Sequence, residues 1–249
     1  MEQQPTYSEF SDLRLVAIYN TVNPIDGYRD FYVNLASKLS ASSIIDVGCG
    51  SGLLTCELVK AGHQLIGVDP SSAMLDLARG SPCGEQGQWI EGGVEKLGEF
   101  QADLAIMTGH VAQFFLDDLS WQAALSSIHN ALRPGGYLVF ESRNPDADLF
   151  ADWPTEESHQ KLQDPAAGPI EWWQELATKG TSVKYEIHYL FAQSGDELVS
   201  PCELRFRTQE EISQSLLSAG FSVQNAFGDW DLSPVGENRP EMIFVAERV

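Results

Sequence analysis

Apolar and polar residues alternate in two different ways along this chain. From residue 44 onward, short apolar runs are separated by longer segments in which apolar residues recur every three or four positions. Short runs are typical of buried strands, and the wider spacing is typical of helices. Within 118–132, for example, Trp121, Leu125 and Ile128 follow the helical spacing. Regular alternation with short connections predicts a doubly wound α/β fold, in which helices cover both faces of a parallel sheet.

Several segments of the alternating part have the pattern of strands. They are 44–47, 64–69, 89–91, 103–107, 137–142, 221–226 and 242–246. The segment Arg133–Gly136 ends the helix at 118–132, because proline and glycine interrupt helical pairing. Thr208 and Glu211 form a capping box before a last helix, which Gly220 ends.

A different pattern interrupts the chain between 146 and 207. In 183–192, aromatic and aliphatic residues at every second position share one face. The turn-forming residues 194–197 connect this run to a second strand-like run at 198–207. We therefore predict an inserted antiparallel β-hairpin. Its aromatic face must be buried, so the insertion is either a cover over a substrate or a dimer surface.

The most informative local feature is a glycine-rich turn after the first predicted strand. The acid Asp46 is followed by Gly48, Gly50 and Gly52, and Leu53 begins a helix. Glycine tolerates a positive φ and lets a ligand approach the backbone closely. The positive end of a helix dipole lies behind the turn. A strand, a glycine turn and a helix predict a nucleotide-binding corner.

Two common nucleotide motifs do not fit this turn. Leu53 stands where a dinucleotide fingerprint requires its third glycine, and no lysine occurs before Lys60 to complete a P-loop. A second acid, Asp69, ends the next predicted strand, 21 residues after Gly48. At that spacing an acid meets the hydroxyl groups of a ribose. The ligand is therefore expected to be a nucleoside derivative other than a dinucleotide.

These residues resemble the first two motifs of the class I S-adenosylmethionine (SAM)-dependent methyltransferases. The first motif is an acid, an apolar residue and Gly-x-Gly-x-Gly at 46–52, and the second is Asp-Pro-Ser-x-x-Met-Leu-x-x-Ala from Asp69. The resemblance covers 40–145 well and 208–249 moderately, and it is weak over 1–39 and 146–207. It implies an α/β/α sandwich with a seven-stranded, mostly parallel sheet whose last strand is antiparallel. It also implies SAM as cofactor, S-adenosylhomocysteine as product and no metal.

The resemblance also implies the residues that contact the cofactor. Asp69 is expected to bind the ribose, and Met74 to pack on the adenine. The acid that the family often has beside the adenine amine is missing, because Gly93 and Val94 occupy its place. The full set of expected contacts is Asp46, Gly48, Cys49, Gly50, Gly52, Asp69, Pro70, Met74, Gly93, Val94, Thr108 and His110, with Tyr19 and Tyr28 closing over the cofactor from the N-terminal segment.

Methyl transfer depends mainly on positioning, and a base is needed only if the acceptor must lose a proton. His110 follows the fourth strand and is the preferred candidate base, with loop ordering or cofactor contact as the alternative. Arg143 ends the fifth strand, where it either clamps an anionic substrate or pairs with one of the many acids. Glu141 and His188 are weaker candidates for the base.

Composition narrows the partners. The 249 residues include 15 basic and 36 acidic side chains, for a net charge of −21, which argues against nucleic acid and anionic membranes. No 18-residue apolar stretch and no signal-peptide pattern are present. The four cysteines have neither CxxC nor zinc spacing. We therefore expect reduced thiols and a cytoplasmic protein.

Together these features predict three parts. Residues 1–39 form a helical segment over the cofactor site, 40–145 and 208–249 form the SAM-binding domain, and 146–207 form the insertion. The predicted function is SAM-dependent methyl transfer to a small-molecule acceptor by a monomer or homodimer. The alternatives are an NAD(P)-dependent oxidoreductase and a SAM-binding module without turnover. The sequence leaves the acceptor unidentified.

Overall fold

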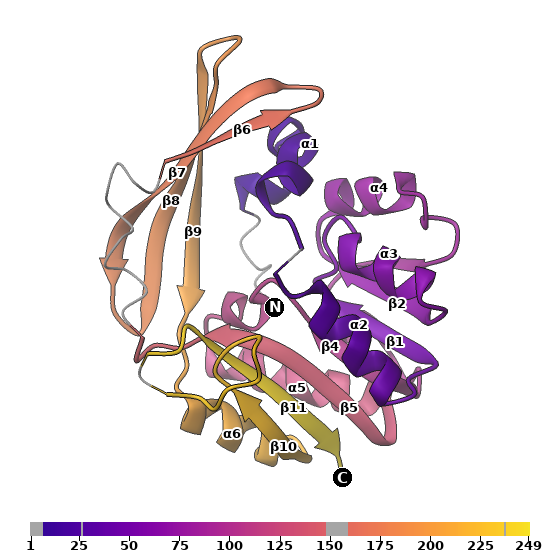
Figure 1. Ribbon diagram of the computed structural model, residues 1–249. Helices are drawn as coiled ribbons and strands as arrows, with labels where there is room; N and C mark the ends of the chain where they lie inside the picture. The colour runs from indigo at the N-terminus through magenta and orange to yellow at the C-terminus, as the bar shows by residue number, and fades with distance from the viewer. Residues whose placement is uncertain (1–6, 26, 148–158, 237) are drawn as a thin grey trace.

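The chain is organised around two separate β-sheets. The computed structural model describes residues 7–25, 27–147, 159–236 and 238–249. One sheet has seven strands in the order β10-β11-β5-β4-β1-β2-β3, and the other has four in the order β6-β7-β8-β9. Figure 1 shows the second sheet rising from one end of the first, with the N-terminal helix α1 between them.

The seven-stranded sheet has the predicted direction pattern. Its strands are β1 (Ser43–Val47), β2 (Gln64–Asp69), β3 (Gln88–Glu91), β4 (Ala102–Met107), β5 (Leu132–Arg143), β10 (Phe221–Phe227) and β11 (Glu241–Arg248). The pairs among β1 to β5 are parallel, and β11 runs antiparallel to both β5 and β10. β5 starts earlier than the predicted Tyr137, because Leu132 already pairs with Ala102 before an irregularity in the register. The predicted sheet of seven strands, with an antiparallel last strand, is confirmed.

Helices cover both faces of this sheet. The helices are α1 (Leu13–Val22), α2 (Arg29–Lys38), α3 (Leu53–Lys60), α4 (Ser72–Gly80), α5 (Asp118–Ala131) and α6 (Gln209–Ser218), and the 3-10 helices are η1 (Ser8–Phe10), η2 (Val94–Lys96) and η3 (Val111–Phe114). Helices α5 and α6 share a core with Ile45 and Ala105, whereas α2 and α3 share another with Ile44 and Ile106. Neighbouring strand residues thus face opposite helical layers, which confirms the α/β/α sandwich. No helix in the described residues is long and apolar enough to cross a membrane.

The switch in strand order sets the position of the site. β1 pairs with β2 on one side and with β4 on the other, so the chain leaves β1 in one direction and later returns to its opposite side. At such a switch point the connections after neighbouring strands diverge, and a crevice forms beyond the carboxyl ends of the strands. The turns after β1, β2 and β4 therefore meet at one place.

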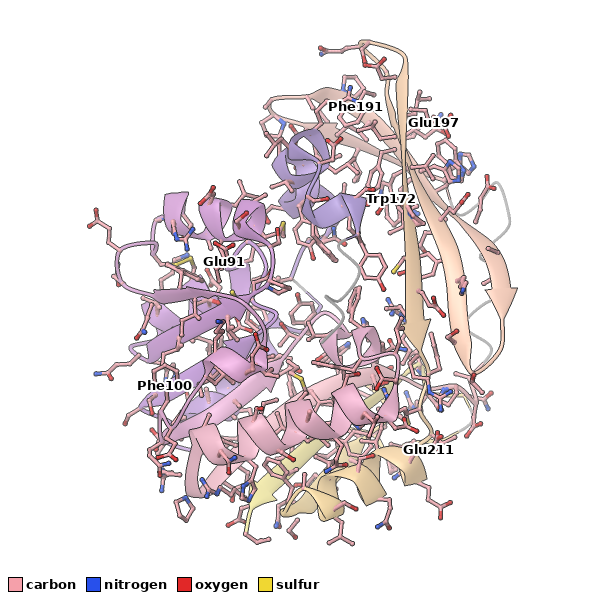
Figure 2. The ribbon with its side chains drawn as sticks, turned by 180° about the vertical axis from the view of Figure 1, so that it is seen from behind. Glu91, Phe100, Trp172, Phe191, Glu197 and Glu211 are labelled. Carbon is pink, nitrogen blue, oxygen red and sulfur yellow. A yellow bond between two sulfur atoms is a disulfide. The ribbon has the colours of Figure 1, made fainter. Side chains whose placement is uncertain are left out.

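The predicted hairpin is part of a larger antiparallel sheet. Its strands are β6 (Gln160–Asp164), β7 (Gly168–Lys179), β8 (Ser182–Phe191) and β9 (Asp196–Arg205). Trp172 and Phe191 lie on the side that shares a hydrophobic core with α1 (Figure 2). Leu15, Ile18 and Val22 of α1 supply the helical part of this core. The aromatic face of the hairpin is therefore buried by the chain's own N-terminal segment.

The expectation of four reduced cysteines is wrong for two of them. Cys56 in α3 and Cys83 after α4 form a disulfide, whereas Cys49 and Cys202 are free thiols. The two partners are 27 residues apart in sequence, and they meet because α3 and α4 both pack against β2. No local spacing reveals a pair that tertiary packing creates. The bond also removes the cysteine argument for a cytoplasmic location.

The disulfide makes a direct prediction about thiol labelling and stability. Alkylation of the denatured, unreduced protein is expected to label only Cys49 and Cys202. Reduction removes a crosslink across 27 residues, and it should lower the unfolding free energy by about 3 kcal/mol because the unfolded chain gains freedom. Peptide mass spectrometry and urea unfolding with and without reductant measure the two effects. Cys202→Ser is the control and should respond to reductant as the unchanged protein does. Labelling of all four cysteines before reduction would contradict the bond.

Candidate functional site

The predicted glycine turn forms between β1 and α3. Gly48, Gly50 and Gly52 have φ values of +70°, +53° and +74°, which other residues rarely adopt. The space is also closed, because a Cβ on Gly48 would lie 2.5 Å from Val111 and one on Gly52 2.7 Å from Trp89. Both requirements exclude side chains at these positions. The turn therefore presents bare backbone beyond the end of β1.

Asp69 holds this turn against the end of β2. Its Oδ2 accepts a hydrogen bond of 2.9 Å from the amide of Gly50, and its Oδ1 accepts one of 2.8 Å from the amide of Ser71. Burial raises the pKa of Asp69, and the two amides act in the opposite direction. The second predicted acid thus meets the first motif in space. Ser71 also caps α4 through a hydrogen bond from the amide of Met74.

Asp46 has an unused acceptor inside the protein. The residue is 1% exposed, and its Oδ2 accepts a hydrogen bond of 2.6 Å from the Thr55 hydroxyl. Its Oδ1 is buried and has no hydrogen-bond partner in the described ranges of the chain. Burial raises the pKa of Asp46 to about 7, although the Thr55 hydrogen bond opposes the shift. A buried acceptor without a donor is costly, so Oδ1 is suited to receive a donor from a ligand.

A third buried acid, Glu141, fixes the turn after β4. Its Oε1 accepts a hydrogen bond of 3.0 Å from the backbone amide of His110, and its Oε2 accepts one from the Tyr32 hydroxyl. Burial raises the pKa of Glu141, while the charge of His110 and both hydrogen bonds lower it. His110 is held at a φ of +61°, an unfavourable value for a residue other than glycine. Such strain persists where the surroundings impose it, most often at functional sites.

The His110 side chain is oriented by the last strand. Its Nε2 lies 3.0 Å from a carboxylate oxygen of Glu241, and both side chains are largely buried. Glu241 is the first residue of β11, far from His110 in the sequence. Neither Glu241 nor Tyr32 was predicted, because neither belongs to a motif. The structure brings both to the candidate base through the pairing of β11 with β5 and the packing of α2.

These groups line one cavity of about 500 Å³ at the switch point. This volume is within the range of small-molecule sites. Of the predicted site residues, the lining includes Asp46, Gly48, Cys49, Gly50, Asp69, Pro70, Thr108, His110, Tyr19, Tyr28 and Arg143. Residues after β1, β2 and β4, and residues at the carboxyl end of β5, thus share the site with the N-terminal segment. No residue of the second sheet, as far as it is described, is part of the lining, although the lining residues Tyr7 and Phe114 pack against the core of that sheet.

Four predicted residues do not reach the cavity wall. They are Gly52, Met74, Gly93 and Val94. Met74 is 1% exposed and lies under the glycine turn, since a Cβ on Gly50 would be 3.3 Å from its Cε. Val94 begins η2, with Gly93 before it. The expected contacts of Met74 and Val94 with the adenine stay predictions.

The structure argues against a chemical role for Cys49 and for His188. Burial and the nearby carboxylates raise the pKa of Cys49 well above its usual range, so Cys49 is a neutral thiol rather than a nucleophile. His188 lies outside the cavity, where it stacks on Trp173 and contacts Glu197. Within the described residues, no cluster of His, Cys, Asp or Glu has an arrangement suited to a metal ion.

Comparison with known proteins finds similarity to methyltransferases. Residues 44–136 match the family model of a methyltransferase domain. A protein of Geobacillus sp. (strain WCH70) with the provisional name of methyltransferase is 26% identical over 90% of this chain and 93% of its own length. The ubiquinone biosynthesis O-methyltransferase of Nitrosococcus oceani is 31% identical, over 53% of this chain and 58% of its own length.

A solved structure has a similar overall fold. A SAM-dependent methyltransferase from Clostridium acetobutylicum ATCC 824 aligns over 94% of this chain and 97% of its own, with a TM-score of 0.78 and 15% sequence identity. The alignment covers nearly the whole of both chains. The second sheet and the N-terminal segment are therefore part of the shared architecture.

The buried charge of Asp46 predicts a pH dependence of stability. The pKa of Asp46 is about 7 in the folded protein against an ordinary value of 3.8. Above pH 7 both states are ionised and the folded state bears the full cost of the buried charge, whereas below 3.8 both are protonated and the cost vanishes. Stability should therefore fall as pH rises through this window. Asp46→Asn keeps an acceptor for Thr55 but removes the charge, so its loss of stability should be smaller.

Urea unfolding of both proteins at about pH 5 and about pH 8 measures this difference. Glu9, whose pKa burial also raises to about 7, keeps part of the slope in each protein. Asp76→Asn is the control, because Asp76 is exposed on α4, and it should retain the full slope. Equal pH slopes for the Asp46 variant and the unchanged protein would show that Asp46 is not buried as a charge.

Proposed function

We propose that this chain, which belongs to the class I SAM-dependent methyltransferases, binds SAM in the cavity at the switch point and methylates a small-molecule acceptor beside it. One observation carries the proposal. The buried Oδ1 of Asp46 has no partner among the described residues, although Asp46 lines the cavity next to the glycine turn. An ammonium group of a ligand would satisfy that acceptor and neutralise its charge.

The residues present fit SAM. We assign Asp69 to the ribose hydroxyls, since it lies at the end of β2 beside the turn. The amino-acid end, which carries an ammonium group, is assigned to Asp46. Acidic residues dominate the charged groups of the lining, which suits a cofactor with a sulfonium and an ammonium centre. When bound, SAM supplies an electrophilic methyl carbon on the sulfonium sulfur, and S-adenosylhomocysteine is the product.

The remaining contacts follow from the positions of the lining residues. Gly48, Cys49 and Gly50 offer backbone atoms along one side, and Pro70 and Thr108 follow β2 and β4. Tyr19 and Tyr28 close the site from the N-terminal segment. Gly52 and Met74 are assigned to shaping the turn from below, while Gly93 and Val94 stay assigned to the adenine edge. These roles are part of the proposal.

We assign His110 as the base that accepts a proton from the acceptor. Glu241 holds the Nε2 side of the imidazole, so Nδ1 is the nitrogen left to accept a proton. A neighbouring carboxylate orients such a ring and stabilises its charged form. Glu141 contributes by holding the backbone of His110 in its strained conformation. Positioning of the acceptor near His110 accounts for the rest of the chemistry.

The net charge of the chain and the name of one relative limit the classes of acceptor. The net charge of −21 supports a small molecule over a nucleic acid. The Nitrosococcus oceani relative is named as an O-methyltransferase, which supports a hydroxyl as one candidate target. Leu53 at the third glycine position argues against the oxidoreductase alternative.

Titration calorimetry with S-adenosylhomocysteine tests the cofactor assignment. The unchanged protein is expected to bind it, and Asp69→Asn should weaken binding roughly tenfold or more, because hydrogen bonds to a charged group are lost. Asp76→Asn, an exposed acid on α4, is the matched control and should bind as the unchanged protein does. No binding at about millimolar ligand, or binding of NADH in its place, would overturn the proposed function.

A further inference from the structure

Arg143 is a cation in the cavity without a carboxylate partner in the part of the chain that the structure describes. It ends β5 and lines the cavity. Its Nη1 donates a hydrogen bond of 3.0 Å to Oε1 of Gln113. No carboxylate oxygen of the described residues lies within 4.0 Å of its guanidinium nitrogens. A guanidinium has five donor hydrogens, and the bond to Gln113 uses one of them.

Among the described residues, an arginine without a carboxylate partner is the exception: besides Arg143 only Arg248 lacks one, and Arg248 lies outside the cavity, where it donates to the carbonyl of Leu132. The chain has 36 acidic side chains against 15 basic ones. Most other arginines form ion pairs: Arg14, Arg29, Arg79, Arg133, Arg205, Arg207 and Arg239 each have a carboxylate within 4.0 Å. In such an acidic protein an unpaired guanidinium inside a cavity is therefore unexpected for a purely structural residue.

The acid nearest in the sheet is already engaged. Glu241 stands directly opposite Arg143 in the antiparallel register of β5 and β11. Side chains opposite each other in such a pair share a face and lie close together. Glu241 nevertheless pairs with His110 rather than with Arg143. The arrangement keeps the guanidinium free while it uses Glu241 for the candidate base.

Gln113 fixes the guanidinium in place. Gln113 is fully buried in η3, and its backbone amide donates a hydrogen bond of 2.9 Å to the carbonyl of His110. Its side-chain oxygen accepts from Arg143, so the neutral amide holds the cation without neutralising it. A preorganised guanidinium loses little freedom when it binds an anion.

An aromatic wall begins beside this group. Phe114 follows Gln113 in η3, and its ring centroid lies 5.3 Å from that of Tyr7 and 5.8 Å from that of Phe10. Phe10 in turn lies 5.9 Å from Tyr19. All four rings line the cavity. Such a surface favours a flat, apolar body, since aromatic rings pack in offset or edge-to-face arrangements.

We propose that the acceptor is a planar ring compound that carries a carboxylate. Arg143 binds the carboxylate as a two-pronged donor, and the wall of Tyr7, Phe10, Tyr19 and Phe114 packs on the ring. The group to be methylated then lies on the ring, on the side of His110. This inference rests on the proposed function and names the substrate class of that same site.

Matched acid and amide probes test the inference. Benzoate, 3,4-dihydroxybenzoate and 2-naphthoate are each compared with their carboxamides, on protein saturated with S-adenosylhomocysteine, by ligand-observed NMR titration. The acids should bind roughly tenfold or more tightly than the amides, since a charge-assisted bidentate pair is replaced by neutral hydrogen bonds. In Arg143→Gln the preference should disappear, and Arg143→Lys should keep part of it because the charge remains without the fork.

Arg133→Gln is the control. Arg133 pairs with Asp103, the second residue of β4, at the opposite end of the sheet from the cavity. The variant loses the same positive charge as Arg143→Gln. It should retain the preference for acids. Acids that bind no better than amides, a preference that survives Arg143→Gln, or tighter binding of the corresponding benzylamines would each overturn the inference.

The affinity for S-adenosylhomocysteine, measured first in every variant, separates the two proposals. If the unchanged protein does not bind it, the proposed function fails. If all variants bind it equally and the acids show no preference, the cofactor assignment stands and only the acceptor class is wrong. Equal affinity also shows that each variant is folded around the site.

Discussion

The burial of carboxylates at the ends of parallel strands is the constraint on which this structure depends. Asp69 ends β2, whereas Asp46 and Glu141 lie near the ends of β1 and β5, and each of the three is less than 9% exposed. A buried carboxylate is costly unless hydrogen bonds or positive charges compensate it. Asp69 is compensated by two backbone amides and Glu141 by a hydroxyl and an amide. Asp46 accepts a hydrogen bond at only one of its two oxygens. A positively charged donor from a ligand would therefore stabilise the carboxylate.

The compensation of these acids explains much of the surrounding architecture. The amide that satisfies Asp69 belongs to the glycine turn, so the acid also shapes the loop. The hydroxyl that satisfies Glu141 comes from Tyr32 in α2, which ties the N-terminal segment to the sheet. The same segment is joined to the turns by Ser51 with Asn20 and by Ser71 with the carbonyl of Phe10. Its α1 packs on the second sheet, so one segment closes the cavity and connects both sheets.

Sequence patterns predicted the features of the structure that depend on residues close together in the chain. The glycine positions follow from φ values and space that only glycine allows, and Asp69 follows from its spacing. The order of elements and the capping box of Thr208 and Glu211 are equally local, and the structure has them. Residues that meet only through tertiary packing have no recognisable pattern in the sequence. Glu241 contacts His110 through the pairing of β11 with β5, and Cys56 of α3 bonds to Cys83 after α4. Strands β6 and β7 were missed because their polar residues do not alternate cleanly. The lining by α1 and η1 was predicted only in part, through Tyr19 and Tyr28.

We propose that Asp46 receives the ammonium group of the cofactor. The number of protons released when SAM binds tests this role, and calorimetry in buffers of low and high ionisation enthalpy measures it. With a pKa of about 7 in the free protein, Asp46 is substantially protonated at about pH 6.5 and ionised at about pH 8.5. A bound ammonium group should lower that pKa, so we expect proton release at the lower pH and almost none at the higher. A binding heat that is independent of the buffer at both pH values would contradict it.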